Sequence, residues 1–232
     1  MLQLDRLTLT QDSFHLTADW SAAAGERVAI MGPSGSGKST LLAGIAGFLA
    51  ATGGAVRWKG QDLGSLAPGD RPVTILFQDQ NLFPHLTLAQ NLGLGVRPDL
   101  RLSGPEWTSV SAALDRVGLP GLGDRRPAQL SGGQASRAAL ARALLRARPM
   151  LLLDEPFAAL GPALRQDMLE LVRQVADETG ALVLLVTHDP DDAQALGGKT
   201  AFVAGGVVQL PVPTDLLFAD PPPALADYLG RK

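Results

Sequence analysis

The chain has 232 residues, of which 46% are hydrophobic and 19% charged, with a formal net charge of −3. A chain this apolar can bury a sizeable core, which excludes intrinsic disorder, and its small acidic excess argues against a nucleic-acid partner. It contains no cysteine, so a disulfide scaffold, a cysteine zinc site and a cysteine nucleophile are excluded.

The order of apolar segments predicts the fold class. The first twenty residues alternate between apolar and polar side chains, which predicts two antiparallel strands with a register shift near Asp5. Continuous apolar runs, typical of strands covered on both faces, follow at 28–31, 73–77, 150–153 and 181–186. Helical patterns lie between them at 39–48, 131–148 and 164–179. This alternation predicts an α/β fold with a largely parallel sheet.

The stretch at about 81–149 differs from its surroundings. Its first part is rich in Gly and Pro and has one clear helical pattern, at 106–117. We expect a single domain in which about 1–80 and 150–232 form the core with an N-terminal antiparallel β subdomain, and about 81–149 form an inserted α-helical subdomain. The tail from 211 is expected to hold one short helix.

The N-terminus shows no basic segment followed by an apolar run, so no secretory signal is expected. No apolar run approaches the roughly 18 residues of a membrane span. We therefore expect a cytosolic protein that docks on a membrane protein.

The strongest motif is a glycine-rich loop between an apolar run and a helical pattern. Its residues are Gly32, Pro33, Ser34, Gly35, Ser36, Gly37, Lys38 and Ser39, followed by Thr40. In such a loop, backbone N–H groups surround phosphate oxygens at a helix N-terminus, Lys38 reaches the β- and γ-phosphates, and Ser39 ligates Mg²⁺. The alternative for this segment alone is a glycine-rich turn with a stray lysine. The strand–loop–helix context favours ATP binding.

Two adjacent carboxylates, Asp154 and Glu155, end the apolar run at 150–153. Because side chains alternate along a strand, the two carboxylates point differently and can have different roles. Asp154 fits a carboxylate on the metal side, and Glu155 fits a base that polarises an attacking water. The alternative is a solvated strand end with ordinary acids.

A second anion-binding helix start is predicted at Leu130–Gln134, where Ser131 can cap a long helix and Gly132 and Gly133 expose backbone N–H groups. Taken alone this segment is weak, since Ser-Gly-Gly is also a common loop.

Together these motifs resemble the ATP-binding cassette (ABC) ATPase family, over essentially the whole chain. Leu130–Gln134 reads as that family's signature, with Gln78 before it and His188 after Asp154 and Glu155. The resemblance implies that Gln78 senses the γ-phosphate and Mg²⁺, and that His188 contacts the γ-phosphate. Without that context, a polar strand end and a buried neutral histidine would be the simpler interpretations. The catalytic residues are then Glu155, His188 and Lys38, with Mg²⁺ held by Ser39, Gln78 and Asp154.

The resemblance also implies partners. A head-to-tail homodimer would place ATP between Lys38 of one subunit and Ser131, Gly132, Gly133 and Gln134 of the other. The stretch 78–91 looks like that of bacterial importer ATPases, in which it contacts integral membrane permease subunits, while a solute-binding protein acts indirectly. This implies a peripheral protein on the cytoplasmic face of the inner membrane.

The same stretch, with Arg71 and the segments at 47–49 and 162–166, is similar to the ATPases of thiamine importers. Importers of ferric iron, polyamines or inorganic anions, and an iron–sulfur assembly cassette, are the alternatives within the family. A small-molecule P-loop kinase and a non-catalytic nucleotide-binding scaffold are the alternatives outside it.

Three features depart from the family pattern. Gln11 stands where an aromatic residue that stacks on adenine is expected, and Phe14 comes late for that role. Gly161 stands where the loop after the catalytic glutamate normally ends in aspartate, and the signature, which the family usually continues with polar residues, is followed here by Ala135 and Ser136 before Arg137. These departures put adenine affinity and communication across the dimer in doubt.

Overall fold

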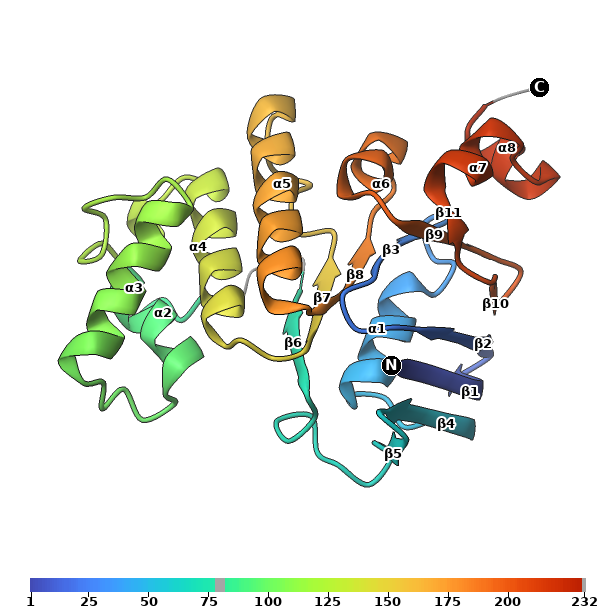
Figure 1. Cartoon of the computed structure of the whole chain (residues 1–232), viewed down its shortest axis with the longest axis horizontal. Coiled ribbons are helices and arrows are strands. Elements are labelled where there is room, and N and C mark those ends of the chain that lie inside the picture. Colours follow the sequence, from blue (N-terminus) through green and yellow to red (C-terminus); the bar gives the residue numbers. More distant parts are fainter. Residues whose placement is uncertain (78–81, 231–232) are drawn as a thin grey trace.

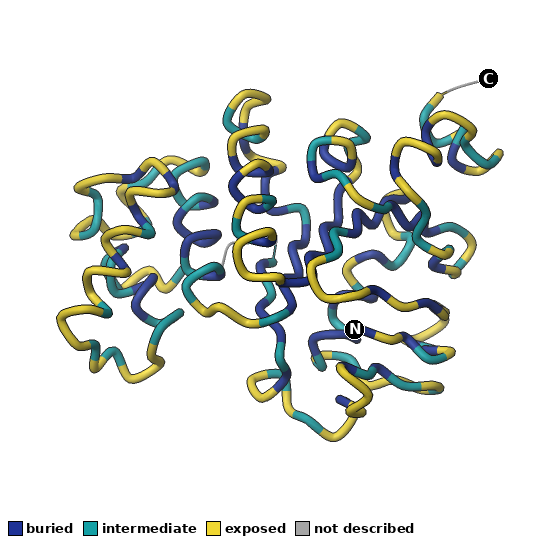
Figure 2. The backbone as a smooth tube through the Cα atoms, viewed as in Figure 1, coloured by how far each residue is buried: buried dark blue, intermediate teal, exposed yellow. Residues whose placement is uncertain are grey.

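The continuous apolar runs form the parallel part of the sheet. The strands β9 (Lys199–Ala204), β3 (Arg27–Met31), β8 (Leu182–Val186), β7 (Met150–Asp154) and β6 (Val73–Leu76) are parallel neighbours in that order. Leu152 and Leu184 point into one hydrophobic core, whereas their neighbours Leu153 and Leu185 point into the other. Because both faces are covered, these strands show no polar alternation. Figure 2 shows these strands buried and the outer turns of the helices exposed.

The computed structural model describes residues 1–77 and 82–230. The strands are β1 (Leu2–Gln11), β2 (Phe14–Ala22), β3 (Arg27–Met31), β4 (Gly53–Trp58), β5 (Gln61–Asp62), β6 (Val73–Leu76), β7 (Met150–Asp154), β8 (Leu182–Val186), β9 (Lys199–Ala204), β10 (Val207–Val208) and β11 (Val212–Pro213). The α-helices are α1 (Lys38–Ala46), α2 (Leu88–Val96), α3 (Gly104–Arg116), α4 (Gly132–Leu145), α5 (Pro162–Thr179), α6 (Pro190–Leu196), α7 (Thr214–Ala219) and α8 (Pro223–Tyr228), and Pro127–Gln129 form a 3₁₀ turn.

The N-terminal strands form the antiparallel part. β1 pairs with β2 along its length, and the register slips between Leu4 and Leu7, where Arg6 has a φ of 46°. This confirms the register shift expected near Asp5. β4 and β5 extend this part on the side of β1, and β10 pairs with both β2 and β9. The short β10 therefore joins the antiparallel strands to the parallel ones.

The helices cover both faces (Figure 1). α1 packs its apolar side chains into the core shared with β1 and β2, whereas α5 packs into the other core. α2, α3 and α4 contact one another and lie at one end of the molecule, at the left of the view.

The expectation of a single helical segment between 81 and 129 was incomplete, because α2 is a second helix there. It starts at a capping box in which the Thr87 side chain accepts from the Gln90 N–H and the Gln90 side chain accepts from the Thr87 N–H. Gly93 and Gly95 obscured it, since glycine is a poor helix former. A side chain at Gly95 would meet the carbonyl oxygen of Arg142 at 2.5 Å. Glycine is therefore required where α2 lies against α4.

The tail holds two short helices, not the one expected. α7 follows β11 directly, and α8 starts with Pro223 in its first turn, a position where a proline costs no hydrogen bond. Among the described residues, no helix is long and apolar enough to cross a membrane.

Candidate active site

The glycine-rich loop connects β3 to α1, and at two of its positions the backbone tolerates only glycine. Gly32 has a φ of 156°, and an added Cβ would lie 2.4 Å from the carbonyl oxygen of Val203. Gly37 has a φ of 102°, and an added Cβ would lie 2.6 Å from the Phe14 ring. Neighbouring strands therefore press on the loop from two sides, which holds its N–H groups at the start of α1.

Lys38, the first residue of α1, turns back over this loop. Its Nζ donates to the carbonyl oxygens of Gly32 and Pro33, at 2.8 Å each. Burial lowers the pKa of Lys38, while the nearby carboxylates of Glu155 and Asp154 oppose that shift. The positive charge of Lys38 therefore lies against the loop, near the carboxylates of Asp154 and Glu155.

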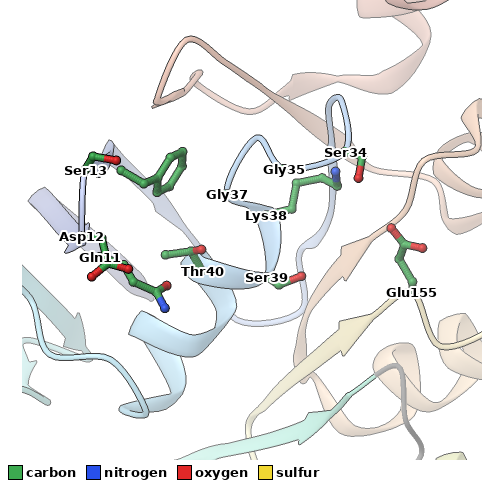
Figure 3. Close-up of a pocket in the computed structure, with 11 residues that line it drawn as sticks. Gln11, Asp12, Ser13, Ser34, Gly35, Gly37, Lys38, Ser39, Thr40 and Glu155 are labelled. Carbon is green, nitrogen blue, oxygen red and sulfur yellow. The ribbon is translucent and has the colours of Figure 1, made fainter.

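A cavity of about 550 Å³ opens over the loop (Figure 3). One wall is the turn between β1 and β2, the second is the loop with the first residues of α1, and Glu155 faces them from the opposite side. The lining residues are Gln11, Asp12, Ser13, Phe14, Ser34, Gly35, Gly37, Lys38, Ser39, Thr40 and Glu155. Phe14 therefore reaches the cavity although its position in the sequence suggested that it came too late.

Asp154 and Glu155 diverge as expected. Asp154 ends β7 and accepts a hydrogen bond of 3.1 Å from the Ser39 hydroxyl. Burial raises the pKa of Asp154, although the bond from Ser39 lowers it in part. A carboxylate and a hydroxyl side by side at the start of α1 are hard oxygen donors, the type that Mg²⁺ prefers.

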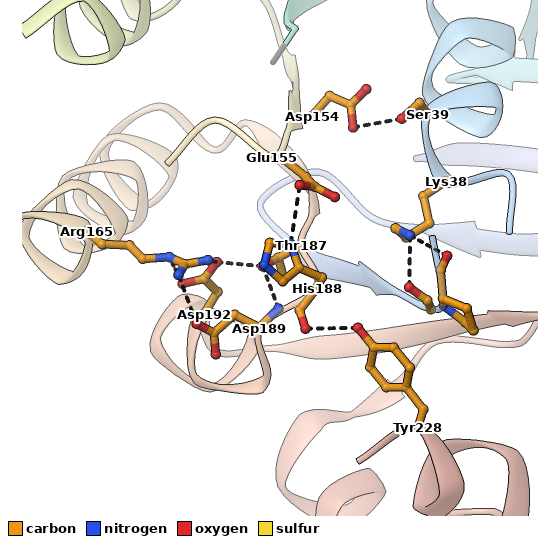
Figure 4. A network of polar contacts seen from close by, with 12 residues as sticks. Lys38, Ser39, Asp154, Glu155, Arg165, Thr187, His188, Asp189, Asp192 and Tyr228 are labelled. Carbon is orange, nitrogen blue, oxygen red and sulfur yellow. Dashed lines mark hydrogen bonds and ion pairs between the residues drawn. The ribbon is translucent and has the colours of Figure 1, made fainter. Parts of the chain in front are cut away.

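Glu155 adopts the left-handed region, with a φ of 45°, which is uncommon for a residue with a side chain. Its N–H donates to the carbonyl oxygen of Val186 at 3.1 Å, which fixes it to the end of β8. Its Oε2 lies 3.2 Å from Nδ1 of His188. The structure thus brings Lys38, Ser39, Asp154, Glu155 and His188 to one edge of the sheet (Figure 4).

A polar network that the sequence did not reveal supports this edge. Arg165 of α5 donates to Asp189 at 2.9 Å and to the buried Asp192 at 2.6 Å. Asp192 also accepts from the Thr187 hydroxyl at 2.5 Å. On the other side, the Tyr228 hydroxyl donates to the carbonyl oxygen of His188. These residues come from α5, α6, α8 and the segment between β8 and α6, and no local pattern connects them.

One predicted group is not part of this constellation, and another lies outside the described residues. Ser131 caps α4 and forms a capping box with Gln134, as expected, but none of the residues lining the cavity belongs to Leu130–Gln134. Gln78, predicted to sense the γ-phosphate and Mg²⁺, lies outside the described residues.

A separate groove of about 600 Å³ lies between the sheet and the helices α2 and α4. It is lined by Phe48, Thr74, Ile75, Leu76, Phe83, Leu94, Gly95, Pro98, Ala139, Arg142, Ala143 and Arg146. Phe48 and Phe83 remain 59% and 47% exposed, which is unusual for large apolar side chains. The buried Asn91 donates to the Phe83 carbonyl oxygen at 3.1 Å and accepts from the Phe83 N–H at 2.7 Å. This rim of the groove is therefore held in place from α2.

Comparison with known proteins identifies relatives that align with this chain over essentially its full length. Residues 17–158 match the profile of a family described as ABC transporter. The chain is 63% identical over 230 residues to the thiamine import ATP-binding protein ThiQ of Cereibacter sphaeroides, covering 99% of this chain and 100% of that protein. It is 49% identical over 232 residues to ThiQ of Yersinia pestis, covering 100% and 98%.

Among solved structures, the ATP-binding cassette MJ0796, a dimer in a post-hydrolysis state bound to ADP and Pi, is similar. The TM-score is 0.82 at 30% identity, and the similarity covers 92% of this chain and 99% of that one. The comparisons confirm the predicted resemblance, the α/β cassette fold and the ATPase class. Since a family profile matches more than half of its residues and relatives align over its full length, this chain belongs to the ABC transporter family, as an ATP-binding cassette ATPase.

Proposed function

We propose that this ATPase energises the import of thiamine. The observation that carries the proposal is the 63% identity, over the whole of both chains, to a thiamine import ATP-binding protein. Importers of ferric iron, polyamines or inorganic anions are the competing possibilities, because nothing in an ATPase subunit need contact the cargo.

The residues around the cavity fit ATP hydrolysis. The loop N–H groups and Lys38 bind the phosphates, Glu155 orients the attacking water, and His188 contacts the γ-phosphate. The side chain of Ser36 supports this role, since its buried Oγ has no hydrogen-bond partner among the described residues and a phosphate oxygen would supply one. Gly35, Ser34 and Thr40 complete the binding surface around the phosphates.

Ser39 and Asp154 would hold Mg²⁺, together with Gln78 from outside the described part. Their donor set fits this ion, which takes one or two protein oxygens and completes its shell with phosphates and water. When bound, Mg²⁺ neutralises the charge that develops on the phosphates. Asp154, whose pKa is raised by burial, gains a partner for its negative charge at the same time.

The signature residues Ser131, Gly132, Gly133 and Gln134 act in a second copy. Solved cassettes of this type form dimers, and in this chain the signature helix does not reach its own cavity. A head-to-tail homodimer gives each ATP both phosphate-binding helix starts. Binding of ATP then closes the dimer, and hydrolysis reopens it.

The groove between Phe48 and Phe83 is where the permease subunits dock. It lies beside α4, the helix that begins at the signature, and Phe83 of the stretch 78–91 forms part of its border. A short helix from an integral membrane subunit would bury both aromatic side chains there. Docked in this way, the ATPase would act as a peripheral protein on the cytoplasmic face of the bacterial inner membrane, with the solute-binding protein acting indirectly.

Isolation of the complex from detergent-solubilised membranes tests this function. The tagged chain should copurify with integral membrane subunits, and thiamine with its binding protein should stimulate ATP hydrolysis by the reconstituted complex. If a different solute stimulated ATP hydrolysis and thiamine did not, that solute would be the cargo in place of thiamine. Recovery only with soluble partners would contradict the importer assignment.

A further inference from the structure

The C-terminal helix α8 reaches the end of β8 through one side chain. The Tyr228 hydroxyl donates a hydrogen bond of 2.9 Å to the carbonyl oxygen of His188 (Figure 4). Tyr228 is the only tyrosine of the chain. We propose that Tyr228 is a positioning residue for hydrolysis, which holds the His188 main chain so that the imidazole meets Glu155 and the γ-phosphate. This inference rests on the proposed role of His188.

The ring of Tyr228 is anchored independently of its hydroxyl. It packs against Phe202 of β9, with the ring centroids 5.7 Å apart. Phe202 is buried and is the register partner of Met31, the last residue of β3 before the glycine-rich loop. The tyrosine is therefore seated on β9, the strand that pairs with β3 just before the phosphate-binding loop, and its hydroxyl has a defined direction.

The main chain on each side of His188 is also fixed. The Thr187 N–H donates to the carbonyl oxygen of Ile30 at 3.2 Å, and the Asp189 N–H donates to the Thr187 hydroxyl at 3.1 Å. The His188 side chain, in contrast, is 56% exposed, with Glu155 as its hydrogen-bond partner among the described residues. Its position depends on the backbone that carries it, and the Tyr228 bond restrains rotation of the peptide between His188 and Asp189.

The tyrosine is suited to act as a donor. Burial raises the pKa of Tyr228, and the negative charges of Glu155 and Asp189 raise it further. The hydroxyl therefore keeps its proton at neutral pH. A phenylalanine at this position would keep the ring contact with Phe202 and lose the bond alone.

The experiment compares Tyr228→Phe, His188→Ala and the double variant in the purified full-length chain, by steady-state and single-turnover hydrolysis of ATP. Loss of one hydrogen bond should lower kcat of Tyr228→Phe about three- to tenfold, leave KM for ATP within about twofold and leave the melting temperature nearly unchanged. In the His188→Ala background, Tyr228→Phe should have no further effect on kcat, because the residue it positions is gone.

Thr214→Val is the matched control. It removes a buried hydroxyl from α7 that pairs with Thr200 at 2.9 Å, so it should lower the melting temperature and leave kcat unchanged. A wild-type kcat in Tyr228→Phe, or an equal loss in the wild-type and His188→Ala backgrounds, would overturn the positioning role alone. A wild-type rate in His188→Ala would instead overturn the role of His188, and the inference with it.

Discussion

Glu155 and His188 face each other across the ends of two neighbouring strands, with Oε2 of Glu155 3.2 Å from Nδ1 of His188. β7 leads into Glu155 and β8 leads into His188, and the two strands are parallel neighbours. Because parallel strands end at the same edge, residues 33 positions apart in the sequence form one unit. The unusual backbone of Glu155 and its bond to Val186 hold this unit in place.

Replacing Glu155 by Gln should lower the hydrolysis rate at least about a hundredfold, because a general base is lost. ATP binding should persist, since the loop and Lys38 are untouched, and the variant should accumulate as a dimer with ATP. Phosphate release, nucleotide binding and light scattering measure the three effects. Asp191→Asn, which changes an exposed carboxylate on α6, is the control and should hydrolyse ATP normally. Rapid turnover by Glu155→Gln would remove Glu155 from the base role.

Replacing Asp154 by Asn should stabilise the protein in the absence of nucleotide and Mg²⁺. Burial raises the pKa of Asp154 in the folded chain. The ionised form of Asp154 therefore lowers the stability of the folded chain at neutral pH. This loss of stability disappears as the pH falls below the ordinary pKa of aspartate, because Asp154 is then protonated in both the folded and the unfolded chain. The melting temperature of Asp154→Asn should exceed that of the wild type at pH 7 and approach it in acid.

A gain of 1 kcal/mol corresponds to roughly 2–4 °C for a chain of this size. With Mg²⁺ and ATP present the order should reverse, because the wild type gains more from the ion. If Asp154→Asn were less stable than the wild type at pH 7 in the presence of a chelator, burial of the ionised Asp154 carboxylate would not destabilise the folded chain.

Phe83→Ala should uncouple hydrolysis from transport. Phe83 is exposed at the rim of the groove and is not among the residues that line the cavity over the glycine-rich loop, so hydrolysis by the isolated subunit should remain near the wild-type rate. Copurification with the membrane subunits and thiamine uptake should fall. Trp107→Ala, at a partly exposed aromatic residue of α3 outside the groove, should retain both. Normal uptake by Phe83→Ala would exclude this groove as the docking site.

Gln11→Tyr should tighten ATP binding. Gln11 is exposed on the cavity wall that the turn between β1 and β2 forms, where a tyrosine ring could stack on a base. Stacking is worth about 1–3 kcal/mol per base, so the affinity should rise about tenfold or more. Titration calorimetry with ATP and GTP measures both affinity and base selectivity. An unchanged affinity would show that another group, such as the nearby Phe14, already supplies this contact.

The sequence predicted the parts of the fold that have local signals. The apolar runs became β3, β6, β7 and β8, and the capping pattern at Ser131 became the start of α4. α2 was obscured by Gly93 and Gly95, whose place in the helix follows from tertiary contacts: Gly95 lies against Arg142 of α4, and Gly93 lies against Leu100 and Leu102. The division into a core and an inserted helical subdomain at about 81–149 stays a prediction.

The site was predictable where its residues follow a motif, as in the glycine-rich loop and the pair Asp154 and Glu155. The contact of Tyr228 with His188 was not predictable, because it joins residues 40 positions apart through a tertiary arrangement of α8. The same holds for Arg165, which reaches Asp189 and Asp192 from another helix. The identity of the cargo was not predictable from these residues, because they do not contact the cargo.

The most direct measurement is uptake of labelled thiamine, at low external concentration, by cells that lack this gene. The account predicts that uptake is lost, that the wild-type gene restores it, and that Glu155→Gln does not. Normal uptake in the deletion strain, with its other thiamine transporters also removed, would contradict thiamine import as the function of this ATPase.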